Sequence, residues 1–172
     1  MRRALAPLLA VIVGCNSGPR PLVAGQDGCD FCRMMIADTR FGGELVTRTG
    51  RVHTFDSIEC LASYVSTAGD TTGVRGIWVA DFASKRLVPA QSARYLLGGK
   101  MHAPMGRDIA SFAPTATAEA LRQTYQGEII TWQDVLALVR ARGATRADAP
   151  NGTRLGTDSA QVATPDSNAR KS

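Results

Sequence analysis

Two stretches of the chain have the same pattern of hydrophobic and polar positions, one starting at Gly50 and the other at Gly127. In each, a glycine precedes a short run rich in β-branched residues, and apolar residues then recur at helical spacing. This pattern predicts a turn, a short strand and a helix, in that order. A single offset relates the matched residues, which are Thr54 with Thr131, Phe55 with Trp132, and Ile58 with Val135. We therefore predict an internal duplication, with a chance likeness of two strand–helix units as the alternative.

The predicted helices have recognisable ends. Asp56 with Glu59, and Thr131 with Asp134, have the spacing of helix N-terminal capping pairs. Gly143 is well placed to end the second helix, because glycine readily adopts the left-handed backbone conformation that closes many helices. The residues expected on the apolar faces are Ile58, Leu61, Ala62 and Val65 in the first helix, and Val135, Leu138 and Val139 in the second.

Further strands are predicted upstream of each stretch. Residues 34–38 (MMIAD) and 42–49 (GGELVTRT) are expected to pair as a hairpin, and residues 76–82 and 92–99 are expected to be strands. Another helix is expected over residues 117–126. The predicted fold class is α+β, with two related strand-strand-helix units in one domain, related by a pseudo-twofold axis.

The N-terminus has the features of an export signal. Residues 1–14 begin with Arg2 and Arg3 and continue as an apolar run that is too short to span a bilayer. The run ends in Ile-Val-Gly-Cys, so we predict that Cys15 is lipidated. The protein would then be extracytoplasmic and anchored by lipid to the periplasmic face of the cell membrane. A plain secretory signal with an incidental cysteine is the alternative.

Composition divides the rest of the chain into three parts. Residues 15–26 contain several glycines and prolines and are expected to form a lipidated tether. Residues 143–172 contain no aromatic residue and almost no large aliphatic one. Burial cannot offset the entropy of ordering such a segment, so we expect a disordered tail. Residues 27–142 are then predicted to form one compact α+β domain.

The charge distribution argues against nucleic-acid binding. The formal net charge is +5, but the basic residues are scattered and aromatic residues make up only 6% of the chain. A nucleic-acid interface usually shows clustered basic residues, often with interleaved aromatic residues.

Export would place the cysteines in an oxidising compartment. With Cys15 as the lipid carrier, Cys29, Cys32 and Cys60 remain, which is an odd number. Unpaired thiols tend to oxidise outside the cytoplasm, and a bound metal is one reason to keep them. Cys60 lies off the main apolar face of its helix and is expected to be a structural thiol, with a ligand role as the alternative. His53 is expected to face solvent from its strand.

Two segments gather soft donor atoms. CDFCRMM, residues 29–35, contains four sulfur side chains, and KMHAPMG, residues 100–106, adds a Met-His-Met loop in the second half. Thiolate and thioether sulfurs select Cu(I) over hard ions, and structural zinc does not recruit thioethers. A pseudo-twofold axis would bring the two loops face to face. The alternative is a Cys29–Cys32 disulfide beside core methionines, and core packing is what we expect of Met35.

Five motifs follow one another in the order seen in a known family: the lipobox ending in Cys15, CDFCRMMI, FDSIECL, WVADF with the later ARYLLGG, and APMGRDIASFA. With these motifs the chain resembles the NosL family, copper-binding lipoproteins that accompany nitrous oxide reductase. Arg33 stands where members of that family typically have glycine, a residue that allows backbone angles that arginine avoids.

The resemblance implies a function and a site. The function is that of a membrane-anchored extracytoplasmic protein that binds Cu(I) and delivers copper to nitrous oxide reductase of denitrification, or to another copper enzyme. It implies a metallochaperone, not an enzyme, and a fold similar to part of organomercurial lyase. The metal ligands that match the family motifs are Cys29, Cys32, Met34 and Met105, with Met101, His102 and His53 as secondary candidates.

Three other classes of function stay open. A thiol-disulfide oxidoreductase using Cys29-x-x-Cys32 is the main alternative, although such enzymes usually place the motif at a helix N-terminus and MMIAD has strand character. A lyase acting on carbon–mercury bonds is suggested by the fold alone, which is a weak argument. The third is a lipoprotein domain with a structural disulfide.

Overall fold

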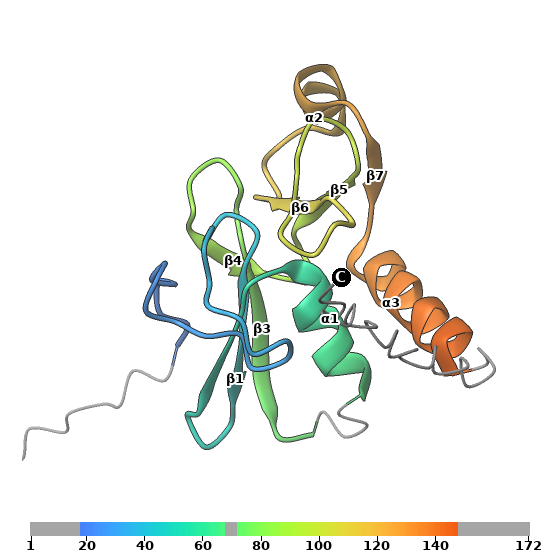
Figure 1. Ribbon diagram of the computed structural model, residues 1–172. Helices are drawn as coiled ribbons and strands as arrows, with labels where there is room; N and C mark the ends of the chain where they lie inside the picture. Colours follow the sequence, from blue (N-terminus) through green and yellow to red (C-terminus); the bar gives the residue numbers. More distant parts are fainter. Residues whose placement is uncertain (1–17, 68–71, 148–172) are drawn as a thin grey trace, which may run out of the picture.

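The computed structural model describes residues 18–67 and 72–147, which form two antiparallel sheets and three helices (Figure 1). The first sheet has the strand order β2-β1-β3-β4 and the second has the order β6-β5-β7. None of the helices in the described segments is both long and apolar enough to cross a membrane. The α+β class predicted from the sequence is confirmed.

The first sheet is built around β1. β1 and β2 form a hairpin whose turn contains Gly50 at a φ of 88°, a left-handed conformation that suits glycine. β3 pairs with the other edge of β1, and β4 pairs with β3. The strands are β1 (Gly43–Thr47), β2 (Val52–Phe55), β3 (Val74–Ala80) and β4 (Leu87–Pro89).

The second sheet is built around β5. Both of its neighbours, β6 and β7, pair with β5 in antiparallel orientation. Helix α2 lies next to β7 in the chain, and α3 follows β7 directly. The elements are β5 (Arg94–Leu97), β6 (Ile109–Phe112), α2 (Ala118–Tyr125), β7 (Glu128–Ile130) and α3 (Trp132–Ala147).

Hydrogen bonds at the end of β3 join the two sheets. The amide of Phe82 donates to the carbonyl of Ser111 over 2.8 Å, and the hydroxyl of Ser111 donates to the carbonyl of Ala80 over 2.6 Å. The carboxylate of Asp81 accepts the amide of Ala113 over 3.0 Å. These bonds fix the second sheet to the first and satisfy polar groups that are buried between them.

Two hydrophobic cores lie on opposite faces of the second sheet. Tyr95 packs into the larger core, and the next residue, Leu96, packs into the smaller one, because successive strand side chains point to opposite faces. The larger core also contains α1 (Ile58–Thr67) and α3, which contact each other. This packing holds the two strand–helix segments together.

Both predicted strand–helix segments are present, and so is the helix expected over residues 117–126. Thr131 and Asp134 form the predicted reciprocal cap, with Asp134 accepting the Thr131 amide at 2.8 Å. In the first segment the cap is Ser57, whose hydroxyl accepts the amide of Cys60 over 3.1 Å. The prediction that Asp56 caps this helix is wrong. The pseudo-twofold axis itself stays a prediction.

Two other expectations are also wrong. Residues 34–38 do not form a hairpin with β1, because β2 and β3 occupy both edges of β1. Met35 makes only an isolated bridge with Gly28. Helix α3 does not end at Gly143 but continues to Ala147.

The described part of the segment predicted to be a tether makes contacts with the domain. The backbone amide of Arg20 donates to the buried carboxylate of Glu44 over 3.0 Å, and the Arg20 guanidinium pairs with Asp27 at 2.6 Å. Contacts with the domain are therefore present from residue 20, and the division of the chain at residue 27 stays a prediction. Cys15 and residues 148–172, to which the lipid anchor and most of the predicted tail belong, lie outside the described residues.

Candidate metal centre

The loop that contains Cys29 and Cys32 is folded back on itself. The amide of Cys29 donates to the carbonyl of Met34 over 2.8 Å, and the amide of Arg33 donates to the carbonyl of Cys29 over 3.0 Å. The hydroxyl of Thr54 on β2 donates to the carbonyl of Gly28 over 2.7 Å. The loop is thereby closed and held against β2, which fixes where its thiols point.

The reversal of this loop depends on Arg33. Its φ is 67°, in the left-handed region that residues other than glycine rarely adopt. The side chain is largely exposed, and its guanidinium is 3.7 Å from Asp30. An exposed pair at that distance contributes little to stability, so the backbone conformation is imposed by the loop and not by the side chain.

His53 connects β2 to the same loop. Its Nδ1 lies 2.6 Å from a carboxylate oxygen of Asp30, and the amide of Asp30 donates to the carbonyl of Thr54 over 2.8 Å. Only 8% of His53 is exposed. The expectation that His53 faces solvent is therefore wrong, because the loop covers that side of the strand.

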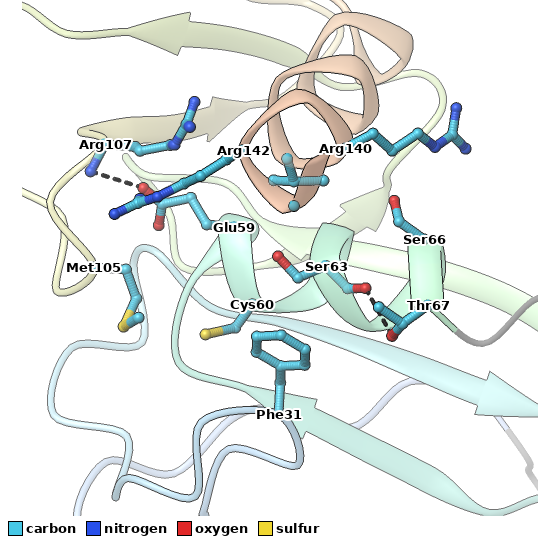
Figure 2. A pocket seen from close by; sticks show the side chains of 12 residues that line it. Phe31, Glu59, Cys60, Ser63, Ser66, Thr67, Met105, Arg107, Arg140 and Arg142 are labelled. Atoms are coloured by element: carbon cyan, nitrogen blue, oxygen red, sulfur yellow. Dashed lines mark hydrogen bonds between the residues drawn. The ribbon is translucent and has the colours of Figure 1, made fainter. Parts of the chain in front are cut away.

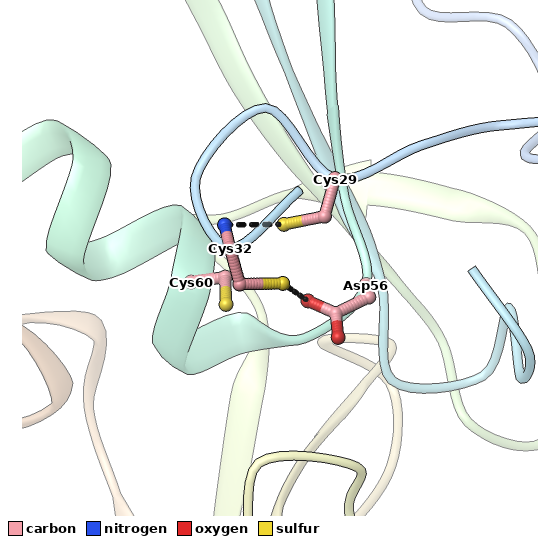
Figure 3. A group of neighbouring side chains, drawn as sticks. All are labelled: Cys29, Cys32, Asp56 and Cys60. Atoms are coloured by element: carbon pink, nitrogen blue, oxygen red, sulfur yellow. Dashed lines mark hydrogen bonds between the residues drawn. The ribbon is translucent and has the colours of Figure 1, made fainter. Parts of the chain in front are cut away.

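Four potential ligand groups converge next to this loop (Figure 3). One ligand atom from each of the four side chains lies within 4.8 Å of the others, and they belong to Cys29, Cys32, Asp56 and Cys60. The first two come from the loop, Asp56 follows β2, and Cys60 lies in the first turn of α1. Because Ser57 is the cap, Asp56 is free to point at Cys32, with 3.6 Å between carboxylate oxygen and Sγ.

The three cysteines are free thiols with different affinities for protons. The pKa of Cys29 is lowered to about 6, mainly because the Cys60 thiol donates a hydrogen bond to its sulfur. The pKa of Cys60 is raised, because this bond holds its proton and the thiol is buried. Burial also raises the pKa of Cys32. Near neutral pH the group therefore holds one thiolate and two thiols, and a metal must displace two protons to bind all three sulfurs.

This donor set fits a soft metal ion. Three thiolates suit Cu(I), while three thiolates and one carboxylate also match the ligand number of tetrahedral zinc. Cys29 and Cys60 are almost completely buried, and Cys32 is partly exposed. The arrangement can thus shield a bound ion from water on one side and leave Cys32 accessible on the other.

The predicted methionine ligands lie in different environments. Met34 is 47% exposed on the surface of the loop, and Met35, expected in the core, is 57% exposed, so that expectation is wrong. Met105 is partly buried and lines the same cavity as Cys60. Met101 is buried in the smaller core, and the ring of His102 is largely exposed, 3.9 Å from Asp108.

A hydrogen bond fixes the Met105 loop relative to α1. The amide of Arg107 donates to a carboxylate oxygen of Glu59 over 2.8 Å. Glu59 precedes Cys60 in the first turn of α1, so this bond holds the second methionine loop beside the cysteine group. The structure therefore brings Cys29 and Cys32 together and places Met105 nearby, across the boundary between the two halves.

Sequence reasoning missed two members of the group. The sequence predicts a helix cap at Asp56 and mainly a structural thiol at Cys60. One signal could have pointed to Cys60: if Cys15 carries a lipid, as predicted, an odd number of cysteines remains. Asp56 precedes the cap residue Ser57, so no helical spacing relates it to Cys60.

A family model for NosL matches residues 22–138, which is more than half of the chain. The chain belongs to the NosL family. It is also similar to a solved structure, the crystal structure of the copper chaperone NosL from Shewanella denitrificans. The TM-score is 0.53 at 25% sequence identity, and the match covers 67% of this chain and 96% of the other. No curated protein matches the sequence.

Membership of the NosL family confirms the resemblance inferred from the sequence motifs. The matched region begins at residue 22, in agreement with the packing of the segment before residue 27. It includes the whole cysteine group and the Met105 loop. The similarity to organomercurial lyase stays a prediction.

Proposed function

We propose that this NosL protein is a Cu(I) chaperone without enzymatic activity. The observation that supports this most is the convergence of three free thiols, from a loop and a helix, within 4.8 Å of one another and of Asp56. In this proposal the thiolates of Cys29, Cys32 and Cys60 hold the ion, and Met105 offers an exchangeable thioether. The similarity to a solved copper chaperone supports the choice of metal.

The proposed site can hold the copper ion and can also release it to another protein. Cys29 is the first thiolate available, because its pKa is lowered to about 6. Buried sulfurs keep water from one side of the ion, which favours a soft, weakly hydrated ion over a hard one. Cys32 and Met105 are only partly buried, so an incoming ligand can reach the ion from their side. Met34, on the exposed surface of the loop, is a further donor for the ion during transfer.

The location and the client of the chaperone are part of the same proposal. Lipidation at Cys15 would anchor the domain to the periplasmic face of the membrane, and the receiving enzyme would be nitrous oxide reductase during assembly of its copper cluster. The lipobox and the family motifs support these two statements. Replacing Cys15 with Ser should release the protein from the membrane fraction.

Anaerobic titration with Cu(I) tests the metal site. We expect stoichiometric uptake, seen as ultraviolet thiolate-to-metal absorption, and a preference for Cu(I) over Zn²⁺ in competition. Cys60→Ser should weaken Cu(I) binding by about tenfold or more. Removing a residue that only hydrogen-bonds to a metal ligand already causes a loss of about this size, and Cys60 is proposed to be a ligand itself. Tighter binding of Zn²⁺ than of Cu(I) would contradict the proposal, and so would unchanged Cu(I) affinity in Cys60→Ser.

One observation favours a second function, thiol-disulfide exchange. A cysteine with a pKa of about 6 is a good nucleophile at neutral pH. However, Cys29 is only 2% exposed, and neither loop cysteine begins a helix. Reduction of a model disulfide under turnover conditions measures this activity directly. Turnover that is lost in Cys29→Ser, together with no copper uptake by the wild type, would favour the oxidoreductase.

A further inference from the structure

A cavity of about 530 Å³ opens between α1 and α3, beside the metal centre (Figure 2). Phe31, Cys60 and Met105 line one end of it, and Val139 of α3 lines the apolar wall. A volume of this size is in the range of sites for small molecules. Cys60 therefore belongs both to the metal centre and to the wall of a cavity large enough for a ligand.

The wall of the cavity contains a buried acceptor without a partner. Glu59 is only 6% exposed, and one of its carboxylate oxygens accepts the amide of Arg107. The other oxygen, Oε2, has no hydrogen-bond partner within the described part of the chain, and the same holds for the hydroxyl of Ser66 farther along the cavity. An unpaired buried carboxylate oxygen costs free energy, which a ligand N–H would recover.

Positive charge lies along the cavity. Arg107 lies near the end formed by Glu59, and Arg140 lies on α3 toward the end formed by Ser66 (Figure 2). Both guanidinium groups belong to residues that line the cavity, and guanidinium groups bind carboxylates in paired hydrogen bonds. The cavity thus offers guanidinium groups for a carboxylate and a carboxylate oxygen for an N–H group. The sulfur atoms of Cys60 and Met105 lie at one end of it.

We propose that this cavity binds a small anionic thiol, a compound with carboxylates, an amide or ammonium N–H and one sulfhydryl. Its carboxylates pair with Arg107 and Arg140, its N–H donates to Glu59 Oε2, and its sulfur lies at the end formed by Cys60 and Met105. Bound in this way, the thiol reaches the metal centre. The role in copper exchange rests on the proposed function, whereas binding of the thiol to the metal-free protein does not.

The exchange step is a ligand substitution without electron transfer. The incoming thiol loses its proton as its sulfur binds Cu(I), and the bond between Cu(I) and Cys60 breaks. The Cys60 thiolate takes up the proton that the incoming thiol releases. Copper stays Cu(I) throughout, and the proton count is unchanged.

The experiment uses reduced glutathione as the probe and the full chain in detergent. We expect saturable binding to the metal-free protein by calorimetry. S-methylglutathione, which has the same charges but no free thiol, should bind within a few-fold, whereas only glutathione should accelerate transfer of Cu(I) to a colorimetric chelator. Arg140→Glu should weaken binding of both compounds by at least about tenfold, and Arg51→Glu, an exposed arginine in the β1–β2 turn, should leave it unchanged.

The outcomes separate this inference from the proposed function. Normal Cu(I) uptake without glutathione binding, or with binding that Arg140→Glu does not affect, would overturn the inference alone. Glutathione binding without Cu(I) uptake would overturn the chaperone and leave the ligand site. If inorganic phosphate binds the cavity as tightly as glutathione and displaces it, the cavity is a general anion site. That result would reject the proposal that the ligand is a thiol.

Discussion

Arg33 adopts a left-handed backbone conformation at the centre of the cysteine loop, where glycine would fit without strain. The cost of this conformation for a residue other than glycine is on the order of 1 kcal/mol or more. Arg33→Gly should therefore stabilise the protein by roughly 0.5–1 kcal/mol, even though glycine has more freedom in the unfolded chain. Urea unfolding under reducing conditions measures the change. Arg33→Ala is the control, because it removes the side chain but keeps the strain, and a gain of equal size in that variant would contradict the explanation.

Glu44 should make stability depend on pH. Its side chain is fully buried on β1, and burial raises its pKa to about 7. Between its ordinary pKa of 4.5 and 7, the folded protein holds a proton that the unfolded chain releases, so stability falls as pH rises through this window. The loss levels off only about one pH unit above the folded-state pKa and amounts to at most roughly 3 kcal/mol.

Glu44→Gln tests this pH dependence, because the amide does not titrate. The difference in unfolding free energy between the variant and the wild type should be larger at pH 8 than at pH 5, in favour of the variant. Any cost of placing an amide beside the backbone of Arg20 is the same at both pH values and cancels. A difference that does not change with pH would show that Glu44 is already ionised at pH 5.

At the scale of elements, helix α3 contains Gly143 in its interior. A Cβ at this position would meet no atom within 4 Å, and the residue does not have a positive φ. Gly143→Ala should stabilise the protein by about 0.5–1 kcal/mol, because alanine loses less conformational freedom in a helix. Gly99→Ala should have the opposite effect, since its φ is 80° and its Cβ would clash with the carbonyl of Gln126. Thermal unfolding distinguishes the two, and destabilisation by Gly143→Ala would place the end of α3 before this residue.

The spacing of apolar residues predicted those helices and strands that have one apolar face and one polar face. The strand–helix segments at β2–α1 and β7–α3 and the short helix α2 follow from local pattern, and so does the cap at Thr131. The pairing of residues 34–38 does not, because strand pairing depends on which edges of β1 other strands occupy. The cap of α1 was misplaced because Asp56 and Ser57 are adjacent and both can cap a helix.

At the scale of the whole molecule, the metal centre depends on contacts between distant segments. The sequence identified the loop cysteines, since their spacing is local. It did not predict that Cys60 and Asp56 join them, because this requires α1 to begin at Ile58 and the loop to lie against β2. Only the family motifs rank Met105 above Met101 as a ligand, and the residue pattern alone does not separate them. In the structure Met101 is buried in the smaller core, whereas Met105 lines the cavity beside Cys60.

This difference between the two methionines provides a test of a site that bridges both halves. Replacing methionine with leucine removes the thioether and nearly keeps the volume, so either variant should lose less than about 1.5 kcal/mol of stability. If Met105 supplies a thioether to copper held by the cysteines, Met105→Leu should weaken Cu(I) binding by about tenfold or more, within the range seen when even outer partners of metal ligands are removed.

Met101→Leu is the matched control, and we expect its Cu(I) affinity to equal that of the wild type, because its sulfur lies in the other core. Competition with a colorimetric Cu(I) chelator under anaerobic conditions measures both affinities, and thermal unfolding confirms that both variants are folded. Equal affinities in Met105→Leu and the wild type would confine the ion to the cysteine group of the first half. A loss in Met101→Leu instead would require the smaller core to open when copper binds. A loss in Met105→Leu alone would show that the ion is held between the halves, where the hydrogen bond from Arg107 to Glu59 keeps the methionine loop in place.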